Sequence, residues 1–140
     1  MRKLNLMMVL SGFLFSSVSY GQVTNPVQDN PISVVLPIDV VIEGNYHATG
    51  MNPDGGRYEA VVAVSKSGQT YKVAWAVGDQ QYVGTGILHG DAFAVIWVGG
   101  EDVPPGLVVY KVNADRTFDG TYAYLGGTQL AFETWKPRKR

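Results

Sequence analysis

The sequence predicts an all-β fold, in which an eight-stranded antiparallel up-and-down meander closes into a small barrel. Short runs rich in β-branched and aromatic residues recur about every ten residues from residue 39 onward, a spacing typical of β sandwiches and barrels. The turns between these runs are too short for crossover helices, so neighbouring strands must be antiparallel. No long stretch has the 3.6-residue period of an amphipathic helix.

The predicted strands follow one another with short connections. They span residues 39–48, 57–65, 70–77, 80–88, 91–98, 106–112, 117–125 and 128–135. Residues that tolerate positive φ mark most of the turns, which are expected at Ser67-Gly68, Gly78-Asp79, His89-Gly90, 113–116 and Gly126-Gly127. Because an open meander would expose two strand edges, we expect the first and last strands to pair and close the barrel.

The period of two along each strand predicts which side chains point into the barrel. Large apolar residues share one face with glycines, whereas polar residues such as Glu43, Lys72 and Thr121 take the other. A glycine within a strand leaves room for a ring from elsewhere in a small barrel. The expected inward residues are Val40, Ile42, Gly44, Tyr46, Tyr71, Val73, Trp75, Val77, Tyr82, Gly84, Gly86, Leu88, Phe93, Val95, Trp97, Val108, Tyr110, Val112, Phe118, Gly120, Tyr122 and Tyr124.

The composition excludes several classes of protein. The 140 residues include 17 glycines and no cysteine, and the net charge is -1. The absence of cysteine excludes disulfide scaffolds, thiolate metal sites and thiol nucleophiles. The small net charge gives no field that would attract nucleic acid, and the glycines do not recur every third residue as in collagen. We therefore expect one domain without a nucleic-acid partner.

The first 21 residues are typical of a secretory signal peptide. Arg2 and Lys3 supply a positive start, and the apolar stretch that follows is too short to span a bilayer. Ser19 and Gly21 are the small residues expected before a cleavage site. We expect cleavage between Gly21 and Gln22, and an exported, periplasmic or extracellular protein that is soluble and has no membrane anchor.

Four segments make up the expected domain organisation. The signal peptide covers residues 1–21, and a lead-in with three prolines, expected to be extended, covers 22–38. The barrel domain covers 39–135, and a short basic tail covers 136–140.

The predicted strands 70–77 and 91–98 are apolar on their outward face as well as on their inward face. The outward residues are Ala74, Ala76, Ala92, Ala94, Ile96 and Val98. A contiguous apolar outer face must be covered. The cover is either the apolar segment 32–36 of the same chain or a second copy in a homodimer.

Several segments resemble a group of small exported bacterial β proteins, most of them hypothetical. They are 43–46 (EGNY), 50–58 (GMNPDGGRY), 68–75 (GQTYKVAW), 84–88 (GTGIL), 109–115 (VYKVNAD) and 118–122 (FDGTY), within a resemblance that covers residues 43–134. The resemblance implies a lipocalin-like or avidin-like barrel, and some members carry a fibronectin-binding label, which implies a host-matrix protein as one kind of partner. The shared motifs consist of turn and core residues, so they imply no catalytic residue. The chain departs from the pattern at 130–133, where a glycine would precede the glutamate.

The meander also predicts where a binding site would lie. Alternate connections share one end of a barrel, and here they are residues 49–56, 78–79, 99–105 and 126–127. The six rings expected near this end are Tyr46, Tyr58, Trp75, Tyr82, Trp97 and Tyr124, with Asp54, Glu101 and Asp102 on the rim. A barrel of about eight strands can hold one small ligand. We predict a pocket for a small apolar or aromatic ligand, or a contact surface for an extracellular protein; the alternative is that the rings only fill the core.

No group of residues predicts catalysis, a metal site or a cofactor. His47 and His89 are expected at opposite ends of the barrel, so a serine nucleophile has no evident base. The spacing of the carboxylates selects no acid–base pair among Asp39, Glu43, Glu59 and Glu133. We therefore predict a non-enzymatic binding module. A structural or protein-interaction domain without a pocket is the alternative, and a small hydrolase is the least favoured of the three.

Overall fold

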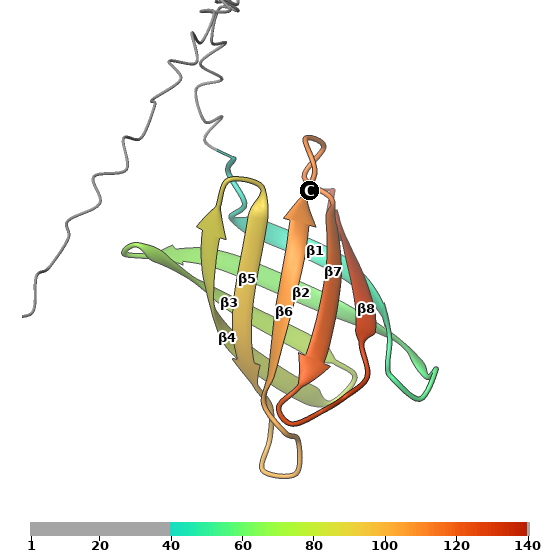
Figure 1. The fold of residues 1–140 in the computed structure, drawn as a ribbon. Helices are drawn as coiled ribbons and strands as arrows, with labels where there is room; N and C mark the ends of the chain where they lie inside the picture. The colour runs from blue at the N-terminus through green and yellow to red at the C-terminus, as the bar shows by residue number, and fades with distance from the viewer. Residues whose placement is uncertain (1–39, 140) are drawn as a thin grey trace, which may run out of the picture. The chain divides into compact units, whose positions relative to one another are not determined.

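The computed structural model describes residues 40–139, which form a closed antiparallel barrel (Figure 1). Each strand pairs with the next in the sequence, and the last pairs with the first. The strands are β1 (Gly44–Met51), β2 (Arg57–Ser67), β3 (Thr70–Val77), β4 (Gln80–His89), β5 (Ala92–Val98), β6 (Gly106–Val112), β7 (Phe118–Tyr124) and β8 (Ala131–Pro137). The predicted fold class is confirmed. The predicted signal peptide and the lead-in 22–38 lie outside the described residues.

The largest difference from the predicted strand boundaries is in β1. It begins at Gly44 rather than at residue 39, and it ends at Met51 rather than at 48. Gly50 pairs with Tyr58 on one side and with Glu133 on the other. Pairing with two neighbours therefore extends the strand past its β-branched and aromatic run, as tertiary context often does.

The last strand is also displaced toward the carboxyl terminus. β8 begins at Ala131, so the connection from β7 is longer than the predicted turn at Gly126-Gly127. It continues to Pro137, which pairs with Tyr46, and thus includes the first two residues of the predicted basic tail. A proline is tolerated at this position because it lies at the end of the strand.

The inward face agrees with the prediction, and the large predicted residues are buried or partly buried. The interior has two different halves. At the end that holds the β2–β3, β4–β5 and β6–β7 turns, the rings of Tyr46, Phe93, Phe118 and Trp135 pack together, with centroids 4.7 Å apart for Phe118 and Trp135 and 5.1 Å apart for Tyr46 and Phe118. This half is filled by side chains.

Arg116 closes the filled end. It lies in the β6–β7 turn with φ at 64°, the only non-glycine residue with positive φ among residues 40–139. Its guanidinium donates hydrogen bonds to the Glu43 carbonyl (2.7 Å) and to the Tyr46 hydroxyl oxygen (3.0 Å). The turn is thereby attached to the residues that enter β1.

An apolar surface lies on the outside of the barrel and includes the predicted Ile96 and Val98, but it extends over β4 and β6 rather than being centred on β3 and β5. The exposed side chains gather on β4, β5 and β6, where Val83 pairs with Val98 and Ile96 pairs with Leu107. Val83 is 55% exposed and Ile96 is 62% exposed. The alanines of β3 therefore flank this surface rather than form its centre. The proposed covering segment 32–36 lies outside the described residues.

Glycines make room for the largest inward rings. A Cβ atom built on Gly50 would lie 2.1 Å from the Tyr58 ring, and one built on Gly120 would lie 2.4 Å from the Tyr110 ring. Real Cβ atoms do not approach other atoms so closely, so each ring occupies the space above its glycine. The predicted interleaving of glycines and rings is confirmed at Gly120, whereas Gly50 was expected in the connection 49–56.

This packing predicts that a single methyl group destabilises the barrel. Gly50→Ala and Gly120→Ala should each lower the free energy of unfolding by about 1–3 kcal/mol, because the ring must move from its position. Urea denaturation followed by Trp fluorescence measures the loss. Gly100→Ala is the control, since a Cβ atom at Gly100 would meet no atom within 4 Å. Equal stabilities of all three variants would contradict the packing described here.

Candidate functional site

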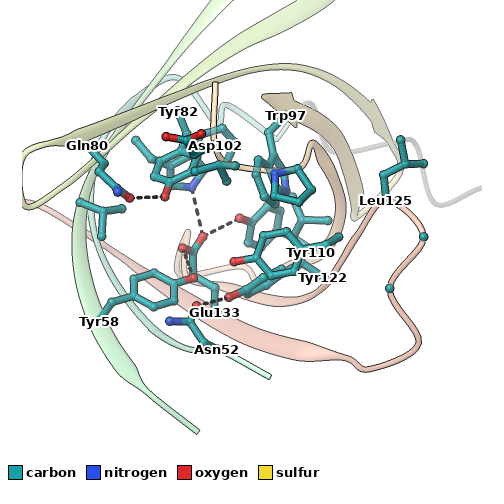
Figure 2. Close-up of a pocket in the computed structure, with 18 residues that line it drawn as sticks. Asn52, Tyr58, Gln80, Tyr82, Trp97, Asp102, Tyr110, Tyr122, Leu125 and Glu133 are labelled. Carbon is teal, nitrogen blue, oxygen red and sulfur yellow. Dashed lines mark hydrogen bonds between the residues drawn. The ribbon is translucent and has the colours of Figure 1, made fainter. Parts of the chain in front are cut away.

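A cavity of about 720 Å³ occupies the other half of the barrel interior (Figure 2). It lies at the end that holds the β1–β2, β3–β4, β5–β6 and β7–β8 connections, as predicted. Its aromatic lining consists of Tyr58, Trp75, Tyr82, Trp97, Tyr110, Tyr122 and Tyr124. The β5–β6 and β7–β8 connections add Asp102 and Leu125 at its mouth. The cavity is therefore mainly aromatic, with few charged groups.

Five of the six predicted rings line this cavity, and the prediction for Tyr46 is wrong. Because β1 starts at Gly44, Tyr46 is only the third residue of that strand and lies near the filled end. It is fully buried, and its hydroxyl donates to the Ile42 carbonyl at 2.7 Å. Tyr46 is a core residue and does not reach the cavity.

The predicted rim is only partly correct. Asp102 lines the cavity, whereas Glu101 and Asp54 do not. The Asp54 carboxylate accepts a hydrogen bond from the Gly56 backbone N–H at 2.9 Å, which stabilises the β1–β2 turn. The turn uses this aspartate for its own geometry, as turns commonly do.

Glu133 is the central residue of the site, and the sequence analysis did not select it. It is 4% exposed, and it is the one charged side chain classed as buried among residues 40–139. Its Oε1 atom accepts hydrogen bonds from the Tyr110 hydroxyl (2.6 Å), from the Trp75 indole N–H (3.1 Å) and from the Trp135 indole N–H. Its Oε2 atom accepts one from the Tyr58 hydroxyl at 2.9 Å. Figure 2 shows Glu133 in the middle of the lining residues.

The strand register explains how two tyrosines reach the same carboxylate. Glu133 pairs with Gly120 on one side and with Gly50 on the other. Beyond these glycines, Gly120 pairs with Tyr110 and Gly50 pairs with Tyr58. Each tyrosine ring crosses its glycine to donate to the carboxylate. Paired positions on β6, β7, β8, β1 and β2 thus form one row across the sheet. In this order its residues are Tyr110, Gly120, Glu133, Gly50 and Tyr58.

Nearer the mouth, further hydrogen bonds fix the orientation of other rings. The Tyr122 hydroxyl donates to the Asn52 side-chain oxygen at 2.9 Å. The Tyr82 hydroxyl donates to the Gln80 side-chain oxygen at 2.6 Å. Trp97 packs edge-on against Tyr82, with ring centroids 5.6 Å apart. The walls of the cavity are therefore held in place before any ligand enters.

The electrostatics of the site keep its tyrosines neutral. Burial, and then the charge of Glu133, raise the pKa of Tyr110 well above its usual range. The same two causes raise the pKa of Tyr58. Burial also raises the pKa of Tyr122 to about 12. These hydroxyls therefore stay protonated and remain hydrogen-bond donors across the physiological range.

Glu133 was not predicted to be a site residue, because the inward-facing residues of the last predicted strand, 128–135, were not assigned. A signal was present, since Ala131 and Trp135 flank it at a spacing of two and both are buried. The period of two would have placed the glutamate on the inward face. A charged residue at an inward position requires partners, so such a position is informative.

The Glu133 network predicts a loss of stability when its charge is removed. Glu133→Gln should lower the free energy of unfolding by about 2–3 kcal/mol, because its amide NH₂ group replaces one of the two accepting oxygens and the remaining bonds lose their charge. Urea denaturation measures the effect. Glu59→Gln is the matched control, since the Glu59 side chain is 76% exposed. If both substitutions lower the free energy of unfolding equally, the hydrogen bonds to the Glu133 carboxylate do not stabilise the fold.

The raised tyrosine pKa values predict that the barrel loses stability in alkali. Above pH about 10 the unfolded chain ionises its tyrosines, whereas the folded protein retains the proton of Tyr110, so the free energy of unfolding falls as pH rises. The slope contributed by Tyr110 should reach about 1.4 kcal/mol per pH unit. Denaturation curves measured at a series of pH values test this. The Tyr110→Phe variant should show a shallower slope, and identical slopes would contradict the assignment.

No protein-family model matches the chain, and no curated protein matches it significantly. Residues 40–139 contain no group of three or more His, Cys, Asp or Glu side chains placed to hold a metal ion, so Asp54, Glu101 and Asp102 do not form one. The same residues include no helix long and apolar enough to cross a membrane. The function must therefore be argued from the geometry of the cavity.

Proposed function

We propose that this protein is a non-enzymatic binding module that takes one small apolar or aromatic ligand into the cavity of its barrel. The observation that carries the proposal is the division of the interior into a filled half and an empty half. A volume of about 720 Å³ lies within the range of pockets that bind small molecules. Its walls are rigid rings rather than flexible side chains.

The alternative, a structural domain without a pocket, accounts less well for the same side chains. Four rings fill the end near Phe118 and Trp135. In the other half the rings line the wall, where hydrogen bonds to Asn52 and Gln80 hold two of them in place. Core packing alone does not require rings held away from the centre.

The lining also supports binding rather than catalysis. Within the part of the chain that the structure describes, it contains no Ser, Thr, Cys, His or Lys side chain, so these residues offer no conventional nucleophile with its base. Glu133 is engaged by four donors, which hold it in an acceptor-only role. The signal peptide proposed for residues 1–21 would place this binding in the periplasm or outside the cell.

Filling the cavity tests the proposal. Val77→Trp places a large ring in the lining, whereas Val83→Trp on the next strand places the same ring on the outer surface, where Val83 is 55% exposed. Three probes with one ring system, namely 1-naphthylmethylamine, 1-naphthylmethanol and 1-naphthoate, are titrated by calorimetry into the wild type and into both variants. We expect at least one probe to bind the wild type and Val83→Trp equally, and to bind Val77→Trp at least about tenfold more weakly, a difference of about 1.4 kcal/mol.

Two results would overturn the proposal. Either none of the three probes binds the wild type, or binding is unaffected by Val77→Trp. Native mass spectrometry of the protein purified from its own host supplies an independent check, because a retained small molecule should appear as an added mass that is absent from Val77→Trp.

A further inference from the structure

We infer that the cavity selects an organic cation, meaning a protonated amine or quaternary ammonium group carried on an aromatic or apolar body. This inference rests on the proposed function, because it names the ligand class of the same cavity. The charges, the hydrogen-bond donors and the ring faces that line the site support it.

The charges of the lining all have one sign. Glu133 lies inside the cavity and Asp102 lies at its mouth, and residues 40–139 contribute no Lys, Arg or His side chain to the lining. An anionic ligand would meet two carboxylates and no cation. A cationic ligand would meet both carboxylates, and its attraction to the buried Glu133 would be stronger than in water, whereas Asp102 is exposed.

Glu133 carries a buried charge whose partners are all neutral. The four groups that donate to it are two tyrosine hydroxyls and two indole N–H groups. Burying a charge without an opposite charge is costly, even when hydrogen bonds satisfy part of it. Three of the four bonds go to Oε1, so Oε2, which receives only the Tyr58 bond, keeps capacity to accept another. A ligand ammonium would supply both the missing charge and the missing donor.

Most of the hydroxyl donors that an anion would need are already used. Of the five tyrosines in the lining, four donate within the protein. Tyr58 and Tyr110 donate to Glu133, Tyr82 donates to Gln80, and Tyr122 donates to Asn52. A hydroxyl with its proton committed presents only lone pairs to a ligand. These four tyrosines therefore offer acceptors and ring faces, which suit a cation better than an anion.

The rings add a further attraction for positive charge. Trp97 lies edge-on to Tyr82, Tyr122 and Tyr124, with centroids 5.4 to 6.4 Å apart. Edge-on packing turns the faces of neighbouring rings in different directions around the cavity. An aromatic face attracts a cation through its quadrupole, and tryptophan does so most strongly. The aromatic lining and the carboxylates thus favour the same ligand class.

The same three probes separate this inference from the proposed function. They share one ring system and differ in charge: 1-naphthylmethylamine is positive at neutral pH, 1-naphthylmethanol is neutral and 1-naphthoate is negative. We expect the amine to bind at least about tenfold more tightly than the alcohol, and the naphthoate to bind most weakly. If the alcohol or the naphthoate binds as tightly as the amine, the inference fails while the proposed function stands. If no probe binds, the proposed function itself fails.

Removing the charge of Asp102 at the mouth tests whether electrostatic attraction contributes to binding, without a change in the barrel interior. Asp102→Asn should weaken binding of the amine about threefold to tenfold and leave binding of the alcohol unchanged, because only the charged probe interacts with the lost carboxylate. Glu101→Gln is the matched control, since this neighbouring carboxylate is exposed and does not line the cavity. Glu133→Gln should abolish the preference for the amine where the variant folds. An amine preference that survives both Asp102→Asn and a folded Glu133→Gln would overturn the inference.

Discussion

The buried carboxylate of Glu133 is the constraint on which the arrangement of this barrel depends. Four side chains from β2, β3, β6 and β8 donate to its two oxygens, so one glutamate connects strands that are not neighbours in the sheet. The register requires a glycine on each side of it, at Gly50 and Gly120, because a side chain there would occupy the space of a donating tyrosine. The strand pairing, the glycines and the donors therefore form one interdependent set.

This network also explains why the interior has two different halves. Trp135 lies two residues beyond Glu133, and together with Phe118 and Tyr46 it fills the end that Arg116 closes. The hydroxyls of Tyr58 and Tyr110 are held toward Glu133, and the Tyr110 ring packs against Trp135 with centroids 4.3 Å apart. Rings that are fixed in this way cannot rotate to fill the remaining space. The hydrogen bonds to the buried Glu133 carboxylate thus leave a cavity in one half of the barrel and a packed core in the other.

Much of the fold could be predicted from the sequence, because its signals are local. Eight strands could be predicted from the β-branched runs and the turn residues. The period of two then predicted the inward faces of six of these strands. The same logic brought five of the six predicted rings to one end. Tyr46 was misplaced because the start of β1 depends on its pairing with β2 and β8 rather than on its own residues. The role of Glu133 could not be predicted, because its four donors lie up to 75 residues away in sequence and meet only when the barrel closes.

The most direct test of this account is hydrogen exchange of the tryptophan indole groups, followed by nuclear magnetic resonance. The account predicts that the indole N–H groups of Trp75 and Trp135 exchange slowly in the wild type, because both donate to Glu133. Trp75 is the more informative of the two, since it also lines the cavity, and its exchange should become fast in a folded Glu133→Ala variant, which removes both accepting oxygens. Fast exchange of Trp75 in the wild type, or protection that is unchanged by Glu133→Ala, would contradict the claim that this carboxylate organises the barrel.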